Sequence, residues 1–262
     1  MNAMTETKPN VNKEVLEQKV KNMYREVALH PEVTYHFEMG RALAERLGYP
    51  THILDHVPAP AIDSFAGVGY YFDLAQLQEG ENVVDLGSGS GMDVFFAARQ
   101  VGEQGEVIGI DMTIEQLAKA EKLKEQYNFK QVVFRKSYIE SIPVVSGSMD
   151  AVISNGVINL CPDKEKVFAE VARVLKPKGR MAIADIVTEK QLPENVVCDS
   201  TLWASCIGGA GQEDTYKNSI EKAGLQVLYV RNNSAYEFIS KSARGASKQY
   251  GVKSVSLLAQ KK

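Results

Sequence analysis

The stretch VVDLGSGSG, residues 83–91, decides the fold predicted for this chain. Its apolar first half is typical of a buried strand, and its glycines mark the turn from that strand into a helix. Glycines at such a turn let the backbone bend tightly and approach a ligand closely. The spacing Gly-x-Gly-x-Gly differs from that of dinucleotide sites, and Asp85 stands just before the loop. The loop therefore suits a cationic ligand better than a pyrophosphate.

Strands and helices alternate along the chain from this loop onward. We expect strands near residues 82–86, 107–110, 132–135, 151–154, 181–186, 226–230 and 252–258. We expect helices over about 92–101, after Thr113 in a capping box with Gln116, and after Asp163 up to Pro177. This pattern predicts an α/β fold with a doubly wound, mostly parallel seven-stranded sheet. Ligands of such sheets bind at the carboxyl ends of the strands.

The remaining segments suggest a lobe and an insertion added to this body. Residues 1–75 are expected to form an N-terminal helical lid, with helices over about 11–27 and 35–47 and a connector at 49–72. Residues 76–262 are expected to form the ligand-binding domain, with a helical insertion at 188–222.

Composition narrows the class of protein. Charged residues make up 24% of the 262 residues and the net charge is -3, which disfavours a nucleic-acid partner. No apolar run approaches the roughly 18 residues of a membrane span, and the polar start does not resemble a signal peptide. We therefore expect a cytoplasmic protein whose cysteines, Cys161, Cys198 and Cys206, are thiols. The oligomeric state stays open.

A carboxylate closes the second strand of the predicted sheet. Asp111 lies about twenty residues beyond the glycine loop, where an acidic side chain can accept hydrogen bonds from both hydroxyls of a ribose. Together with the loop, this position predicts a nucleoside-containing ligand.

These features resemble class I S-adenosylmethionine methyltransferases, which have a Rossmann-like fold. Their cofactor, S-adenosyl-L-methionine, carries a sulfonium, an ammonium and a ribose but no phosphate, in keeping with the loop spacing and Asp85. The cofactor contacts that the resemblance implies are Tyr24, Asp85, Gly87, Ser88, Gly89, Gly91, Asp111, Met112, Tyr138, Ile139, Glu140 and Asn155.

Further segments are similar to the arsenite methyltransferase family. They are residues 20–24, 107–113, 153–160, 202–210 and 250–254. The likeness is expected to run from about Val20 to the C-terminus and so to cover nearly the whole chain. It implies an enzyme that transfers a methyl group from S-adenosylmethionine to a small-molecule acceptor.

The chain departs from that family at its cysteines. The family binds arsenite through cysteine thiolates, which are soft ligands for a soft ion. Gly156 stands where the family has a cysteine, the connector at 66–70 contains none, and residues around Tyr35-His36-Phe37 replace an N-terminal pair. Only Cys206 matches, and Cys161, the candidate substitute, is expected to lie past the pocket.

These departures favour an organic acceptor. The N-terminal lobe is rich in aromatic residues, which suits an apolar or aromatic molecule. The resemblance places His36 near the transferred methyl group, where it is the candidate general base. The candidate acceptor contacts are Tyr35, His36, Gly156, Trp203 and Cys206.

Three alternatives stay open, and no metal site is expected. Although His52 and His56 have the i, i+4 spacing of helical metal ligands, no third ligand is evident. The chain could methylate arsenite or another soft metalloid through Cys206 and Cys161, or bind S-adenosylmethionine without catalysis. A nicotinamide dinucleotide site is the third alternative, which the loop spacing disfavours.

Overall fold

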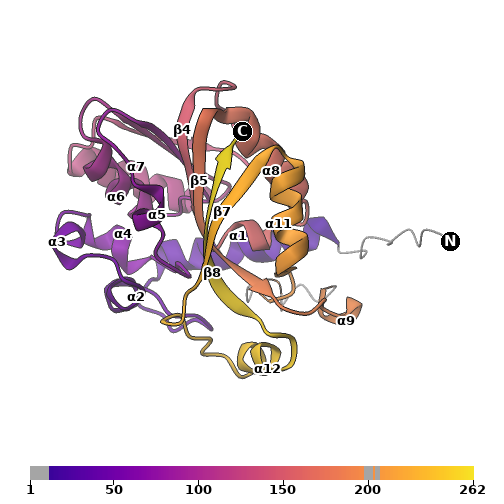
Figure 1. The fold of residues 1–262 in the computed structure, drawn as a ribbon. Helices are drawn as coiled ribbons and strands as arrows, with labels where there is room; N and C mark the ends of the chain where they lie inside the picture. The colour runs from indigo at the N-terminus through magenta and orange to yellow at the C-terminus, as the bar shows by residue number, and fades with distance from the viewer. Residues whose placement is uncertain (1–11, 198–202, 204–206) are drawn as a thin grey trace.

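A twisted sheet forms the centre of the protein (Figure 1). The computed structural model describes residues 12–197, 203 and 207–262. The strand order is β3-β2-β1-β4-β5-β8-β7, and the eighth strand, β6, pairs with β5 off this path. The strands are β1 (Asn82–Leu86), β2 (Glu106–Asp111), β3 (Val132–Lys136), β4 (Met149–Asn155), β5 (Leu175–Thr188), β6 (Gly211–Gln212), β7 (Leu225–Asn232) and β8 (Lys253–Lys261).

The pairing confirms the predicted doubly wound, mostly parallel sheet. All pairs are parallel except those of β8, which runs antiparallel to both β5 and β7. The seven strands on the main path are the seven predicted strands. The two-residue β6 was not predicted because so short a segment has no hydrophobic pattern.

Helices cover both faces of the sheet. On one face lie α6 (Met92–Val101) and α7 (Ile114–Gln126), and on the other α8 (Lys164–Val174) and α11 (Glu213–Lys222) (Figure 1). Alternate residues of β1 feed the two cores, with Val83 facing α6 and Val84 facing α8. Because both faces are buried, the strands read as continuous apolar runs.

Short helices precede the sheet and follow its strands. The N-terminal lobe contains α1 (Lys13–Leu29), α2 (Arg41–Leu47), α3 (Thr51–Leu54), α4 (Ala59–Asp63) and α5 (Phe72–Ala75). The 3-10 helix η1 (Ile158–Leu160), α9 (Glu194–Val197) and α12 (Lys241–Tyr250) follow β4, β5 and β7. No helix in the described ranges combines the length and the apolar character that a membrane span requires.

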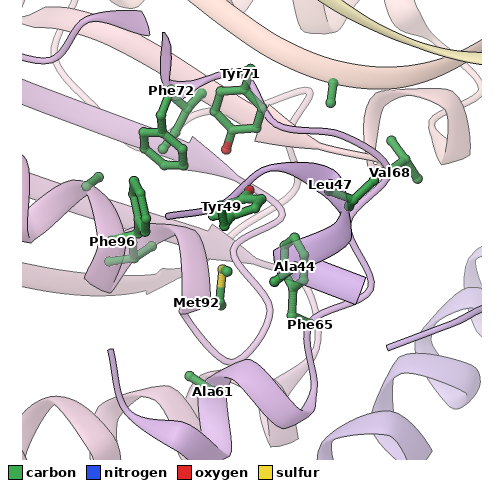
Figure 2. Packing of buried hydrophobic residues seen from close by; sticks show 14 of the residues in the cluster. Ala44, Leu47, Tyr49, Ala61, Phe65, Val68, Tyr71, Phe72, Met92 and Phe96 are labelled. Carbon is green, nitrogen blue, oxygen red and sulfur yellow. The ribbon is translucent and has the colours of Figure 1, made fainter. Parts of the chain in front are cut away.

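The N-terminal lobe shares one core with the face of the sheet covered by α6. The ring centroids of Tyr49 and Phe72 lie 5.3 and 4.4 Å from that of Phe96 on α6 (Figure 2). Leu16 and Val20 of α1 are buried in the same core. The lobe therefore buries its apolar side chains against the body, as expected for so short a segment.

Three local predictions are wrong. The helix predicted over 35–47 begins only at Arg41, because Gly40 has φ +85° and cannot continue a helix. Thr113 makes no side-chain capping bond, since Gln116 instead bonds the hydroxyl of Ser90 and the carbonyl of Tyr24. The helix α8 ends before Pro177 because β5 already begins at Leu175.

Candidate active site

A cavity of about 250 Å³ opens at the carboxyl ends of the parallel strands. The loops after β1, β2, β3 and β4 each contribute to its wall, in keeping with the general position of ligands in such sheets. Helix α1 and the segment Phe65–Gly67 of the connector cover it from the N-terminal lobe. The cavity brings together the predicted cofactor contacts Tyr24, Asp85, Gly87, Ser88, Gly89, Asp111, Met112, Tyr138, Ile139, Glu140 and Asn155.

The glycine loop has a backbone conformation that residues with a side chain rarely adopt. Gly87 and Gly89 have φ +72° and +52°, and a Cβ at Gly87 would lie 2.4 Å from Val157. Gly91 does not line the cavity, because it packs against Phe134, 2.8 Å from where its Cβ would be. The loop therefore brings backbone rather than side chains to the wall of the cavity.

Asp111 fixes the fold of that loop. Its two carboxylate oxygens accept hydrogen bonds from the backbone amides of Gly89, at 2.9 Å, and Thr113, at 2.8 Å. Burial raises the pKa of Asp111, and these backbone donors act against that rise. Each oxygen keeps a second lone pair that can accept a bond from a ligand hydroxyl.

Two further polar groups at the cavity have no hydrogen-bond partner among the described residues. Asp85 is 2% exposed, and no described residue donates a hydrogen bond to its carboxylate. Burial, followed by the charges of Asp93 and Asp111, raises the pKa of Asp85 well above its ordinary value. The hydroxyl of Ser88 is also buried without a partner among the described residues. Such groups point to a missing polar ligand.

Asp93, which the sequence analysis missed, faces the same cavity but is well bonded. It accepts hydrogen bonds from the hydroxyls of Tyr49 and Tyr71, both at 2.7 Å, and from the amide of Asn155 at 3.1 Å. Burial raises the pKa of Asp93, while these three donors lower it. Its position in the first turn of the helix that follows the glycine loop was the available sequence signal.

Asn155 links the connector of the N-terminal lobe to β4. Its amide nitrogen also donates to Tyr49 and to the carbonyl of Gly69, both at 3.0 Å. Its oxygen accepts a bond from the amide of Val68 at 2.7 Å. Asn155 therefore lines the cavity with a side chain whose polar atoms are already used.

Helix α1 is attached to the loops that surround the cavity. Glu17 accepts a hydrogen bond from the hydroxyl of Tyr138 at 2.7 Å, and Lys21 donates to that hydroxyl at 2.9 Å. The side chain of Gln116 donates to the carbonyl of Tyr24 at 2.8 Å. The contacts of Tyr138 are exposed, so each contributes little to stability.

Four of the five predicted acceptor contacts are not among the residues that line the cavity. Tyr35, His36, Gly156 and Trp203 do not line the cavity, and Cys206 lies outside the described residues. The His36 ring meets Phe37 edge-on, with centroids 4.7 Å apart, and Phe37 stacks with Tyr24 at 6.2 Å. The rings of Phe37 and Tyr24 connect His36 to the cavity wall, and its role as a base stays a prediction.

Cys161 lies on the cavity wall, contrary to its prediction. It was expected past the pocket, but the turn of η1 brings it back onto the cavity wall. Burial and a hydrogen bond to the nearby Glu140 raise the pKa of the Cys161 thiol well above its ordinary value. Cys161 therefore loses its proton less easily than an ordinary cysteine, which disfavours the thiolate that a metalloid ligand requires.

The described ranges hold no group of three His, Cys, Asp or Glu side chains arranged to bind a metal ion. Both His52 and His56 are exposed.

The sequence of this chain is similar to those of known methyltransferases. Residues 77–224 match the family described as "Methyltransferase domain". This chain belongs to that family. It is 39% identical over 198 residues to the arsenite methyltransferase of Halobacterium salinarum, covering 75% of this chain and 50% of that relative. It is 44% identical over 137 residues to the human arsenite methyltransferase, covering 49% and 36%. The chain thus spans half or less of the length of these methyltransferases.

Solved methyltransferases have the same fold. An arsenic(III) S-adenosylmethionine methyltransferase from Chlamydomonas reinhardtii is 28% identical, with a TM-score of 0.62 over 85% of this chain and 74% of that one. A geranyl diphosphate C-methyltransferase from Streptomyces coelicolor is 16% identical, with a TM-score of 0.70 over 97% and 100%. The second likeness concerns the fold alone.

These findings confirm the class I methyltransferase fold and the resemblance to arsenite methyltransferases. At the level of the family they also confirm a methyltransferase domain that uses S-adenosylmethionine. The likeness to these relatives covers 75% of the chain in sequence and 85% in structure.

Replacing Asp85 by Asn should stabilise the ligand-free protein. Because the pKa of Asp85 is raised on folding, the folded state holds a proton that the unfolded state releases, and stability falls as the pH rises from about 4. Asp85→Asn removes this loss and should raise the free energy of unfolding at pH 8 by about 1–3 kcal/mol. Thermal denaturation with and without the substitution measures the effect.

Asp150→Asn is the matched control, and we expect it to change stability in the opposite direction. Although burial acts to raise the pKa of Asp150, bonds from Asn82 and Lys176 hold that pKa below its ordinary value. This variant should lose stability at neutral pH. A melting temperature for Asp85→Asn equal to or below that of the original protein at pH 8 would contradict the assignment.

Proposed function

We propose that this chain is an S-adenosylmethionine-dependent methyltransferase that acts on a small organic acceptor. The buried, unpartnered carboxylate of Asp85 in the cavity carries the proposal, because it calls for a cationic group of the ligand. Carboxylates dominate the charged side chains of the described wall, whose single Lys or Arg side chain is Lys13. They are Glu17, Asp85, Asp93, Asp111 and Glu140. This charge favours a sulfonium cofactor over a nicotinamide dinucleotide, whose pyrophosphate needs cationic or amide donors.

The cavity residues fit the parts of this cofactor. Asp85 would accept from the ammonium, and the free hydroxyl of Ser88 would bond the methionyl part beside the glycine loop. Asp111 would accept from the ribose hydroxyls, with Met112 and Tyr138 beside the adenine. When bound, the cofactor supplies a methyl group already activated by a positive sulfur. The protein then needs to align the acceptor and exclude water.

The acceptor side of the cavity supports an apolar or aromatic molecule. Apolar side chains from α1, the connector, α6 and η1 face the cavity from the side of the N-terminal lobe and the loop after β4. They are Leu16, Val20, Phe65, Met92, Val157 and Leu160. A mostly apolar wall with few polar groups is typical of sites for small organic molecules.

The same geometry argues against arsenite as the acceptor. Cys161 is the one cysteine among the described residues of the wall, and its raised pKa keeps it a thiol. Gly156, where the family resemblance expects a cysteine, packs against Val68 of the connector, 3.1 Å from where a Gly156 Cβ would be, and the connector at 66–70 contains no cysteine. A soft metalloid needs at least two thiolate ligands for a stable site.

We further propose that α1 closes the cavity as a lid. It would exclude water from the sulfonium through Leu16, Val20 and Tyr24, and its few exposed bonds to Tyr138 would allow it to open. The contact between Gln116 and Tyr24 would guide its return.

Binding of S-adenosylhomocysteine should order this helix. Hydrogen exchange of residues 13–29 should slow when the product is added, because contacts between α1 and the ligand oppose local opening. Exchange in α8, on the opposite face of the sheet, serves as the internal control and should change little. Unchanged exchange in α1 with bound ligand would exclude the lid.

Substitutions in the loop and at Asp111 test the cofactor site. Asp111→Ala should weaken S-adenosylmethionine binding by about 1–3 kcal/mol, because the ribose loses a charged acceptor. Gly89→Val should weaken it more, since Gly89 has φ +52° and a branched side chain would enter the cavity. Isothermal titration calorimetry measures both effects.

Gly147→Val is the matched control for backbone strain. Gly147 has φ +66° but is distant from the cavity wall and has open space around its Cβ position. This variant should keep the original affinity even if it loses stability. Unchanged affinity in both the Asp111 and the Gly89 variants would refute the site.

Turnover assays distinguish the possible acceptors. We expect release of S-adenosylhomocysteine with one or more apolar or aromatic acceptors from a panel, and less than one turnover with arsenite. Cys161→Ser should leave turnover of the organic acceptor within about threefold, because the thiol is not required as a ligand. Multiple turnovers of arsenite that Cys161→Ser abolishes would support the metalloid alternative. No release with any acceptor, despite tight binding, would support a non-catalytic protein.

A further inference from the structure

Two neighbouring carboxylates at the end of the cavity nearest β1 differ sharply in their surroundings. Asp93 accepts hydrogen bonds from Tyr49, Tyr71 and Asn155, whereas Asp85 accepts none from any described residue. Both side chains are buried, at 5% and 2% exposed, and both line the cavity. Three donors stabilise the ionised form of a carboxylate, and burial without donors disfavours it.

The two groups are close enough to repel each other when both are charged. The charge of Asp93 acts on Asp85, and the charge of Asp85 reaches the hydroxyls of Tyr49 and Tyr71. Neighbouring carboxylates of this kind lose their protons in two separate steps that belong to the pair. The hydrogen bonds decide which member ionises first, and they favour Asp93.

The other charged and titratable groups around Asp85 do not supply a cation. Asp111 on β2 adds a further negative charge. The remaining ionisable side chains of the described wall are Lys13, Glu17, Tyr24, Tyr138, Glu140 and Cys161. Lys13 comes from the first turn of α1, and its charge is not among those that act on Asp85.

We propose that in the ligand-free protein Asp85 carries a proton beside an ionised Asp93, and that a cationic ligand group displaces this proton to solvent. Under the proposed function, on which this inference rests, that group is the ammonium of S-adenosylmethionine. The balance is one ammonium bound to the Asp85 carboxylate and one proton passed to the buffer. Asp93 acts here as a positioning residue, because it localises the proton on Asp85 without needing to contact the ligand.

The linkage makes cofactor affinity depend on pH. Below the pH at which Asp85 loses its proton in the ligand-free protein, affinity should rise about tenfold per pH unit, since one proton is released for each ligand bound. Above that pH the affinity should level off. Asp93→Asn removes the neighbouring charge, so Asp85 ionises more readily and the levelling should move to lower pH.

Calorimetry in two buffers measures the proton directly. S-adenosylhomocysteine, which keeps the ammonium, is titrated into the full chain near pH 6.5 in phosphate and in an imidazole buffer of higher ionisation enthalpy. The α-amino group of the ligand stays largely protonated at this pH, because its ordinary pKa lies near 8. The difference between the two binding enthalpies should correspond to the release of roughly one proton per ligand, by the linkage between binding and protonation.

Three variants assign that proton. Asp85→Asn should bind more weakly and release no proton, Asp93→Asn should release a smaller fraction, and Asp150→Asn, distant from the cavity, should match the original protein. Equal enthalpies in the two buffers, with binding intact, would overturn this inference and leave the proposed function standing. Proton release unchanged in Asp85→Asn would also overturn it. Absence of any ligand binding would instead refute the proposed function.

Discussion

The hydrogen bonds that converge on the buried carboxylate of Asp93 hold this structure together around its cavity. The three donors come from two parts of the protein: Tyr49 and Tyr71 from the N-terminal lobe, and Asn155 from the end of β4. Bonds to an ionised group are stronger than those between neutral groups, and a buried charge without them is costly. The lobe is therefore attached to the body at the same point where the cavity begins. Tyr49, one of these donors, also packs its ring against Phe96 of the body (Figure 2).

The acidic character of the cavity opposes stability and favours binding. The buried Asp85 lies near the charges of the buried Asp93 and the half-buried Asp111, and desolvation raises the pKa of all three carboxyls. A protein selected only for stability would replace such residues with neutral ones. A cationic ligand group removes the penalty at Asp85, so part of the free energy that the fold loses is recovered on binding. This coupling explains why the least satisfied side chain of the cavity is also its best candidate ligand contact.

The fold could be predicted from local patterns because they carry most of its determinants. The bounds of β1 and α6 were predicted to the residue, because glycines next to an apolar run mark where the element begins and ends. The glycine loop and Asp111 were found for the same reason, because each directly follows a buried strand. The helix predicted from residue 35 was wrong because the pattern does not reveal the φ of +85° at Gly40.

The cavity wall was harder to predict because distant segments build it. Asp93 is hydrogen-bonded to Tyr49 and Asn155, which are 44 and 62 residues away from it in the sequence. No short motif encodes such contacts. Cys161 was misplaced because a single turn of 3-10 helix reverses the direction assumed from its position after β4. The predicted acceptor contacts Tyr35 and His36 came from family resemblance, and their rings pack against Phe37 without lining the cavity. The cavity wall thus contains more of the predicted cofactor contacts than of the predicted acceptor contacts.

A crystal structure with S-adenosylhomocysteine tests the central claim most directly, namely that the cavity holds this cofactor by its cationic and ribose groups. The account predicts the ligand ammonium within hydrogen-bonding distance of Asp85 and the ribose hydroxyls on Asp111, with Asp93 still bonded to Tyr49 and Tyr71. A ligand bound elsewhere, or one whose ammonium leaves Asp85 without a partner, would contradict it.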